Sequence, residues 1–284
     1  QHLHEKSVKS LSGLHKRVLL AHTSHGAVQR TYWVKDSEVP SHKLATNQQT
    51  ASVSPSQKIT VSYGMLFSKR ANTEVTHAVG AISKTHLVPG NIHNIKAKVV
   101  GHLDSAHAEY HSVGDTWTKE SLIKISKYST WPAASMAHEY GHYLDHHLFG
   151  DGGSKWRSFG STGTKGKDGY PEPIPEMRPL LNKLYKTEAA KHLIARFKTQ
   201  FVTNDTEGTA ITRYFLSPAE MVARAYAQYV GLRSSKLIHT QIHEMRKLYT
   251  EYGYHAQWED KDFEPIAREF DRLFMKRKLL RSRA

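Results

Sequence analysis

The hydrophobic pattern of this chain changes its period near residue 130, and this change constrains the fold more than any other feature. Before it, short segments rich in β-branched residues have the pattern of strands. After it, apolar residues recur at the spacing of amphipathic helices. Strands followed by helices predict an α+β fold, with a small N-terminal β-sheet and a mostly helical C-terminal part. The expected strands are 96–101, 108–113 and 122–126.

The first expected helix runs from Pro132 to Phe149. It has a proline in its first turn and ends at Gly150, as helices commonly do. A Gly-, Ser- and Lys-rich loop is expected over 150–170. Further helices are expected over 176–185, 188–201, 217–231, 237–252 and 263–278.

Residues 1–58 differ from the rest and predict a basic, polar arm or linker, with room for one hairpin. Within it, 29–35 has the pattern of a lone strand, and 41–58 has the Ser-, Thr- and Gln-rich composition of a linker. We therefore expect an arm over 1–58 and one folded domain over 59–284.

Composition excludes several classes of protein. The 284 residues include no cysteine, which excludes disulfides, cysteine nucleophiles and zinc sites built on thiolates. No run approaches the roughly 18 apolar residues of a membrane helix, so no membrane insertion is expected. The net charge of +14 favours polyanionic partners. A basic tail (Lys276, Arg277, Lys278, Arg281 and Arg283) is the candidate contact, with a solvated basic face as the alternative.

The segment His138-Glu139-Tyr140-Gly141-His142 lies within the first expected helix. Residues four apart share one helix face, so both imidazoles can bind one cation. Glu139 lies beside the pair, where a carboxylate can take a proton from water activated by zinc. Glycine inside a helix costs about 1 kcal/mol relative to alanine. Gly141 therefore predicts that another element approaches closely there.

A third metal ligand has to come from elsewhere in the chain. His146 lies about 12 Å along the helix axis from His138, too far to share an ion with it. The best candidate is Glu220, in the first turn of the helix expected over 217–231. Ser217 and Glu220 also have the spacing of a capping box, in which the carboxylate would only accept a backbone hydrogen bond. Both interpretations stay open at this point.

Other side chains near these segments are assigned supporting roles. Tyr214 is the candidate donor to a developing oxyanion, with core packing as the alternative. Arg224 is expected to pair with Glu220 or Asp145. Asp145 is expected to accept the hydrogen bond that orients a ligand histidine.

His146 and His147 lie in the last turn of the same expected helix. Cationic side chains favour the negative end of the helix dipole. We expect both histidines to be solvated there.

The segment HEYGHYLD, followed far downstream by SPAEMVARAYAQYV, resembles the gluzincins, which are metallopeptidases. More narrowly, it resembles the HExGHxxD-containing metallopeptidase-like domain of phage and mobile-element polyproteins. It is also similar to the catalytic domains of anthrax lethal factor and Pro-Pro endopeptidases. The stretch AHAEYHSVGDTWTKESLIKIS fits a hairpin leading into the metal-binding helix, and the resemblance covers about residues 90–275.

The resemblance implies a zincin-like fold, one zinc ion per chain and hydrolysis of peptide bonds in a protein or peptide substrate. It implies that His138, His142 and Glu220 bind the zinc, that Glu139 is the general base and that Tyr214 assists. It favours a phage particle or the bacterial cytoplasm as the setting, with a secreted effector as the alternative. The competing hypothesis is a phage or mobile-element protein that uses a zincin scaffold to bind nucleic acid or protein without turnover.

Overall fold

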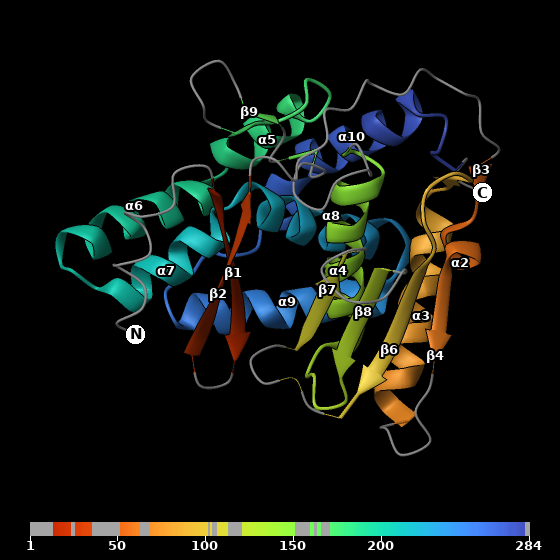
Figure 1. The fold of residues 1–284 in the computed structure, drawn as a ribbon, viewed down its shortest axis with the longest axis horizontal. Coiled ribbons are helices and arrows are strands. Elements are labelled where there is room, and N and C mark those ends of the chain that lie inside the picture. Colours follow the sequence, from red (N-terminus) through yellow and green to blue (C-terminus); the bar gives the residue numbers. More distant parts are fainter. Residues whose placement is uncertain are drawn as a thin grey trace.

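A four-stranded sheet lies in the N-terminal half of the chain (Figure 1). Its order is β4-β6-β8-β7; the first three strands are parallel, and β7 is antiparallel to β8 at the edge. The bounds are Ile59–Ser62 (β4), Ile95–Val100 (β6), Ala108–His111 (β7) and Ser121–Ser126 (β8). The computed structural model describes residues 14–23, 26–35, 52–62, 69–101, 103, 107–112, 121–150, 160–161, 164–165 and 171–281.

Helices cover one face of this sheet. Helix α4 (Pro132–His147) packs against β7 and β8, and α3 (Lys69–Thr85) lies behind β4 and β6 in Figure 1. In β6, Ile95, Ala97 and Val99 are buried toward the helices, whereas Lys96 and Lys98 are exposed. The strict alternation in β6 shows which side of the sheet faces the core.

The unit β4–α3–β6 was not expected from the sequence. It joins two parallel strands through a helix, so one alternating βαβ unit is present where none was predicted. The α+β division is nevertheless confirmed, because the sheet lies in the N-terminal half and the rest is mostly helical. The expected strands correspond to β6, β7 and β8.

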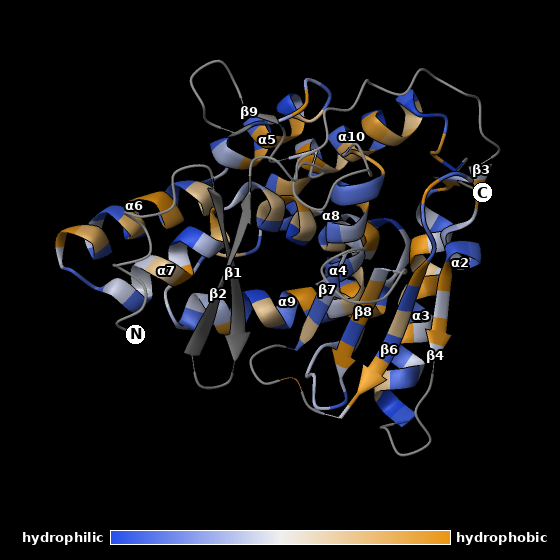
Figure 2. Cartoon of the chain, viewed as in Figure 1, coloured by the Kyte–Doolittle hydropathy of each residue, from blue (hydrophilic) through white to orange (hydrophobic). Residues whose placement is uncertain are grey.

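The C-terminal part is built from six helices among the described residues. Helix α8 is the central one, since every residue from Glu220 to Gly231 is buried. It packs against α3, α4, α9 and α10, and α5, α9 and α10 show distinct apolar and polar faces in Figure 2. Of these six helices, only α7 was not expected from the sequence. The bounds are Arg178–Lys186 (α5), Glu188–Val202 (α6), Thr206–Phe215 (α7), Pro218–Ser234 (α8), Lys236–Glu251 (α9) and Asp260–Lys276 (α10).

The N-terminal arm contains a hairpin of β1 (Leu14–Thr23) and β2 (Gly26–Lys35), so the segment expected as a lone strand has a partner. Residues 52–58 were expected as linker, but they join the folded part. There β3 (Ser52–Val53) pairs with β5 (Val88–Pro89), and α2 (Pro55–Lys58) follows. Lys58 donates hydrogen bonds of 2.7 Å to the carbonyl oxygens of Gly90 and Ile92.

Two segments near the C-terminal helices bear on the sequence expectations. The loop expected over 150–170 lies largely outside the described residues, although β9 (Thr164–Lys165) pairs with β10 (Pro171–Glu172). The basic tail is partly used inside the molecule, because Arg277 forms a 2.6 Å ion pair with Glu176. Arg283 lies outside the described residues. Among the described helices, none has the length and apolar character needed to cross a membrane.

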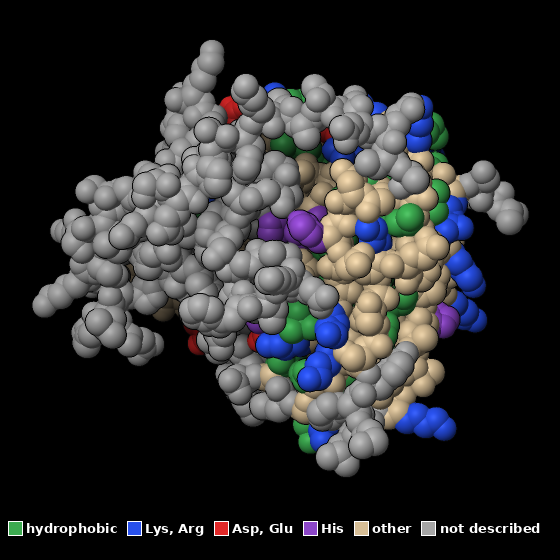
Figure 3. Space-filling view, turned by 45° about the vertical axis from the view of Figure 1, so that its right-hand side comes forward, with side chains coloured by type: hydrophobic (Ala, Val, Ile, Leu, Met, Phe, Trp, Pro, Cys, Tyr) green, Lys and Arg blue, Asp and Glu red, His purple; other side chains and the backbone are tan. Residues whose placement is uncertain are grey.

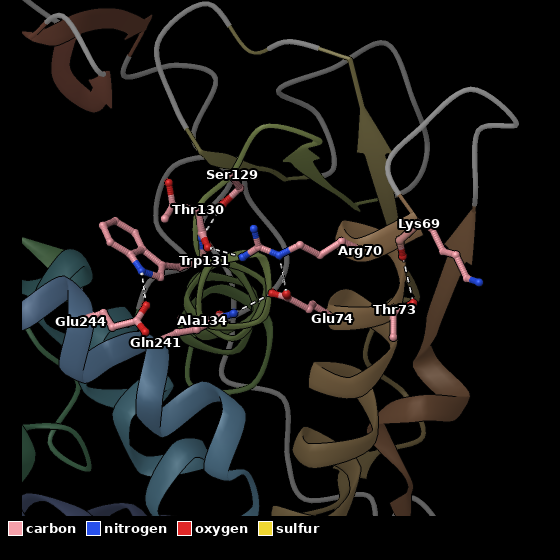
Figure 4. A network of polar contacts seen from close by, with 10 residues as sticks. All are labelled: Lys69, Arg70, Thr73, Glu74, Ser129, Thr130, Trp131, Ala134, Gln241 and Glu244. Carbon is pink, nitrogen blue, oxygen red and sulfur yellow. Dashed lines mark hydrogen bonds and ion pairs between the residues drawn. The ribbon is translucent and has the colours of Figure 1, made fainter.

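A polar network fixes the start of α4 (Figure 4). Trp131 precedes the helix without a side-chain cap, and Gln241 of α9 accepts a 2.9 Å hydrogen bond from the backbone N–H of Ala134 instead. Gln241 in turn donates to Glu74 of α3 at 2.6 Å, and Glu74 pairs with Arg70 at 2.8 Å. Helices α3 and α9 thus supply the partner that the first turn of α4 lacks.

His86 is fully buried between the two halves of the core. Its ring stacks on Phe274 with centroids 4.1 Å apart. Nδ1 lies 2.7 Å from the carbonyl oxygen of Leu87, and Nε2 lies 2.7 Å from the hydroxyl of Tyr226. A carbonyl only accepts, so Nδ1 carries the proton and Nε2 accepts from the tyrosine. Burial lowers the pKa of His86 to about 4.

The depressed pKa of His86 predicts acid destabilisation. The folded pKa lies below the unfolded value, so the contribution of His86 to the free energy of unfolding is fully present above about pH 6.5. This contribution, about 3 kcal/mol, is lost as the pH falls toward 4. Urea unfolding across this pH range measures the loss. His86→Gln should remove this part of the pH dependence, whereas His243→Gln, at an exposed position, should keep it. Parallel pH curves for wild type and His86→Gln would contradict the assignment.

Candidate metal centre

Helix α4 places His138 and His142 on the same side, one turn apart. Their Nε2 atoms are 3.2 Å apart. Glu220, from the first turn of α8, directs Oε2 between them, 3.4 Å from Nε2 of His138 and 3.5 Å from Nε2 of His142. The structure therefore brings together the three residues that the sequence proposed as ligands, and these three could hold a metal ion.

The three donor atoms have the spacing that a tetrahedral ion requires. Ligands about 2.0–2.2 Å from a zinc ion lie about 3.3–3.6 Å from one another at tetrahedral angles. The observed separations of 3.2, 3.4 and 3.5 Å match these edges. Two histidines and one glutamate are also the donor set of several zinc enzymes, in which the fourth position stays open. The donor set and its spacing both fit the metal.

Glu220 does not act as a helix cap. Ser217 is the N-cap residue of α8, but its side chain makes no capping hydrogen bond, and no capping box is present. Glu220 is 4% exposed and faces the two imidazoles. Burial raises the pKa of Glu220, but the attraction and hydrogen bonds of His138 and His142 outweigh this and hold it well below the ordinary range. The carboxylate is therefore ionised.

Gly141 makes the approach of Glu220 feasible. A Cβ atom at this position would lie 2.9 Å from Cα of Ala223 and 3.3 Å from Cβ of Tyr226, both on α8. Real Cβ atoms essentially never show a contact as short as the first of these distances, and the second is tighter than most Cβ contacts. The sequence prediction that another element approaches closely at Gly141 is confirmed, and that element is α8, the helix that carries Glu220.

Arg224 balances the charge of Glu220 from the side away from the histidines. Its Nε lies 3.4 Å from Oε1 of Glu220, and its guanidinium is only 3% exposed. The remaining nitrogens donate to the carbonyl oxygens of Ala256 and Phe215, and the group lies over the rings of Phe215 and Trp258. The expected pairing with Glu220 is confirmed, and these contacts give Arg224 a structural role.

Glu139 lies beside the ligand pair, with Oε1 4.0 Å from Nε2 of His138. Burial raises its pKa to about 7, since the opposing attraction of His142 and a hydrogen bond from the backbone of Tyr110 are weaker. Tyr110 belongs to the edge strand β7, so the sheet directly holds this carboxylate. A carboxyl group with a pKa near neutrality can both accept and return a proton.

Two tyrosines approach the carboxylate of Glu220. The hydroxyl of Tyr214, at the end of α7, hydrogen-bonds to Glu220, and burial together with this charge raises its pKa well above the ordinary value. Burial and the charge of Glu220 raise the pKa of Tyr249, on α9, to about 12. Tyr214 therefore lies at the site as predicted, whereas Tyr249 was missed because nothing in the sequence links α9 to the ligands.

Asp145 is fully buried near the end of α4. Its carboxylate accepts hydrogen bonds from the backbone N–H of Ser161, at 2.8 Å, and from the hydroxyl of the same residue. These bonds tie residues 160–161 to the helix. The expected role of Asp145 in orienting a ligand histidine stays a prediction.

The expectation of solvated histidines at the end of α4 is wrong. His146 is 2% exposed and His147 is 7% exposed. Nδ1 of His146 lies 3.1 Å from the hydroxyl of Tyr110, and Nε2 of His147 lies 3.1 Å from Oγ of Ser121. Burial lowers the pKa of His147 to about 4, so it is neutral. Contact with the sheet, rather than the helix dipole, decides the state of His147.

Comparison with known proteins returned no match, whether with protein-family models, curated proteins or solved structures. The geometry described above therefore carries the functional argument.

The contact at Gly141 predicts a selective effect of adding one methyl group. Gly141→Ala must push α8 away from α4, and we expect a loss of about 1–3 kcal/mol in the free energy of unfolding. Gly80→Ala is the matched control, because nothing lies within 4 Å of a Cβ at this position of α3. That variant should be neutral or stabilised by up to about 1 kcal/mol. Equal unfolding free energies for the two variants would contradict the packing argument.

Proposed function

We propose that this protein is a zinc-dependent metalloendopeptidase. The observation that carries the proposal is the arrangement of His138, His142 and Glu220 at tetrahedral spacing, with the carboxylate of Glu139 beside them. A structural zinc site has four protein ligands, whereas a catalytic site has three and one open position. Among the described residues, the cluster contains three donors, which favours catalysis.

The three ligands would hold the zinc ion, and the guanidinium of Arg224 lies 3.4 Å from the other oxygen of the Glu220 carboxylate. Bound zinc lowers the pKa of water and polarises a carbonyl group. Glu139 takes the proton from the attacking water and returns it to the leaving amine. Its pKa of about 7 suits both steps.

Tyr214 is the candidate donor to the oxyanion that forms on the substrate carbonyl. Its hydroxyl bonds to Glu220 in this structure, so it has to turn to reach a substrate. Arg224 is a weaker candidate, because its nitrogens are engaged with Glu220 and two backbone carbonyls.

The resemblance to gluzincins supports the same function and extends it to a zincin-like fold. An antiparallel edge strand beside the metal-binding helix, and a glutamate from a later helix, agree with this resemblance. The substrate would be a protein or peptide. The likeness to phage and mobile-element domains supports a phage particle or the bacterial cytoplasm as the setting.

Glu139→Gln tests the general base. The amide keeps the shape of the side chain but cannot take a proton, so peptide hydrolysis should fall by about 10²–10⁴-fold while bound zinc stays at the wild-type level. The measurement combines metal analysis with digestion of a peptide library. Glu251→Gln, at an exposed position of α9, is the control and should keep full activity. Full activity of Glu139→Gln, or no hydrolysis by the zinc-loaded wild type, would contradict the mechanism.

Substitutions at Glu220 and Ser217 test the metal ligand against the helix cap. Glu220→Gln should lower the zinc content after dialysis strongly, because one of three ligands is weakened, whereas Ser217→Ala should retain zinc. Glutamine is preferred to alanine here, because it keeps the volume of the side chain and leaves no cavity beside the buried Arg224. Circular dichroism verifies the fold. Greater zinc loss in Ser217→Ala than in Glu220→Gln would reject Glu220 as a ligand.

A further inference from the structure

The sheet has a second face, opposite to the one that packs on the helices. The strand register aligns its side chains in two rows that run across the four strands. The first row contains Thr60, Lys96, Leu122 and His111, and the second contains Ser62, Lys98, Lys124 and Glu109. Lys96 and Lys98 are exposed and Lys124 is partly exposed. We call the three lysines the cationic sheet face.

The three ammonium groups of this face belong to neighbouring positions. Strands are about 4.8 Å apart, and alternate residues on one strand are about 6.8 Å apart. Lys98 lies directly opposite Lys124, and Lys96 is two residues before Lys98 on the same strand. Like charges on neighbouring strands repel one another and destabilise a sheet. An external anion would remove this repulsion.

In the part of the chain that the structure describes, the acidic side chains of the sheet and of the helices behind it are already engaged. Glu109, opposite Lys124, pairs with His111 at 3.0 Å. The other carboxylates among the described residues of 52–150 are committed as well: Glu74 to Arg70 and Gln241, Glu139 to the metal centre, and Asp145 to Ser161. No ion pair among the described residues involves Lys98 or Lys124. In Figure 3, most charged side chains on the described part of the surface are Lys and Arg. Acidic side chains appear there only as small spots near the border with the grey residues.

Protection of an open sheet edge does not explain these lysines. Edge strands commonly carry lysine to prevent pairing with other chains. Here the lysines belong to β6 and β8, which both have neighbours on each side. Their side chains project from the flat face of the sheet, where they could contact a ligand.

We infer that the cationic sheet face binds the phosphate backbone of nucleic acid, independently of base sequence. Lysines supply the charge that phosphates attract, and the exposed hydroxyl of Thr60 in the first row can donate to a phosphate oxygen. Neither row contains Phe, Tyr or Trp for base stacking, and the one ring in the rows, that of His111, is paired with Glu109. Contact with the backbone therefore dominates. Leu122 is the single large apolar side chain in the rows, which disfavours insertion into a lipid surface. This site is separate from the proposed metal centre.

Titration of a labelled DNA duplex of about 20 base pairs with the full chain, at about 50–200 mM KCl, tests the inference. Fluorescence anisotropy gives the affinity at each salt concentration. Each phosphate contact adds about 1 to the magnitude of the slope of log affinity against log salt concentration. The variant replaces Lys96, Lys98 and Lys124 together by glutamine. Its slope should be smaller in magnitude by about 3, and its affinity lower by about tenfold or more. Circular dichroism and zinc content verify the fold of this variant.

The matched control replaces three exposed lysines of α6 and α9, namely Lys198, Lys236 and Lys247, by glutamine. It loses the same charge and should keep most of the affinity and slope. Equal losses in both variants would show diffuse attraction by net charge and overturn the inference. Absence of DNA binding by the wild type would overturn it too, as would tighter lysine-dependent binding to phosphatidylserine vesicles or to polyglutamate. The DNA readout does not depend on hydrolysis, so it stands apart from the test of Glu139.

Discussion

The contact between α4 and α8 is the constraint on which the metal centre depends. Glycine at 141 lets the two helix backbones approach until a side chain from one reaches the histidines of the other. This contact buries Glu220, and a buried carboxylate is costly unless positive groups surround it. His138 and His142 on one side and Arg224 on the other supply that environment. Packing and electrostatics thus support the same geometry.

The sheet contributes to the centre from the opposite side of α4. Edge strand β7 holds Glu139 through the backbone of Tyr110, and the phenol of the same tyrosine contacts His146. At the start of α4, Gln241 accepts a hydrogen bond from the backbone N–H of Ala134 and is itself held by Glu74. The helix is therefore fixed at its beginning, middle and end by different elements. Such support holds the side chains of the candidate metal centre in a defined arrangement.

Local patterns in the sequence predicted the elements that have strong periodicity. The strands β6 to β8, helix α4 and most C-terminal helices were identified because a regular period survives in single segments. Helix α3 was missed within a segment that was not assigned any element, and α7 within a stretch assigned to a connection. Residues 52–58 resemble a linker in composition, yet pairing of β3 with β5 orders them. Composition does not encode such partners.

The sequence by itself determined the pair of histidines on one helix face, the neighbouring Glu139 and a short list of third ligands, because these follow from helix geometry and from the absence of cysteine. Only the tertiary structure showed that Glu220 faces the two histidines and does not cap its helix. Only the tertiary structure buries His146 and His147 and pairs Arg277 with Glu176. It also aligned three lysines across two strands. Each of these outcomes depends on segments far apart in the chain, whose separation in space is set by packing and not by any local period.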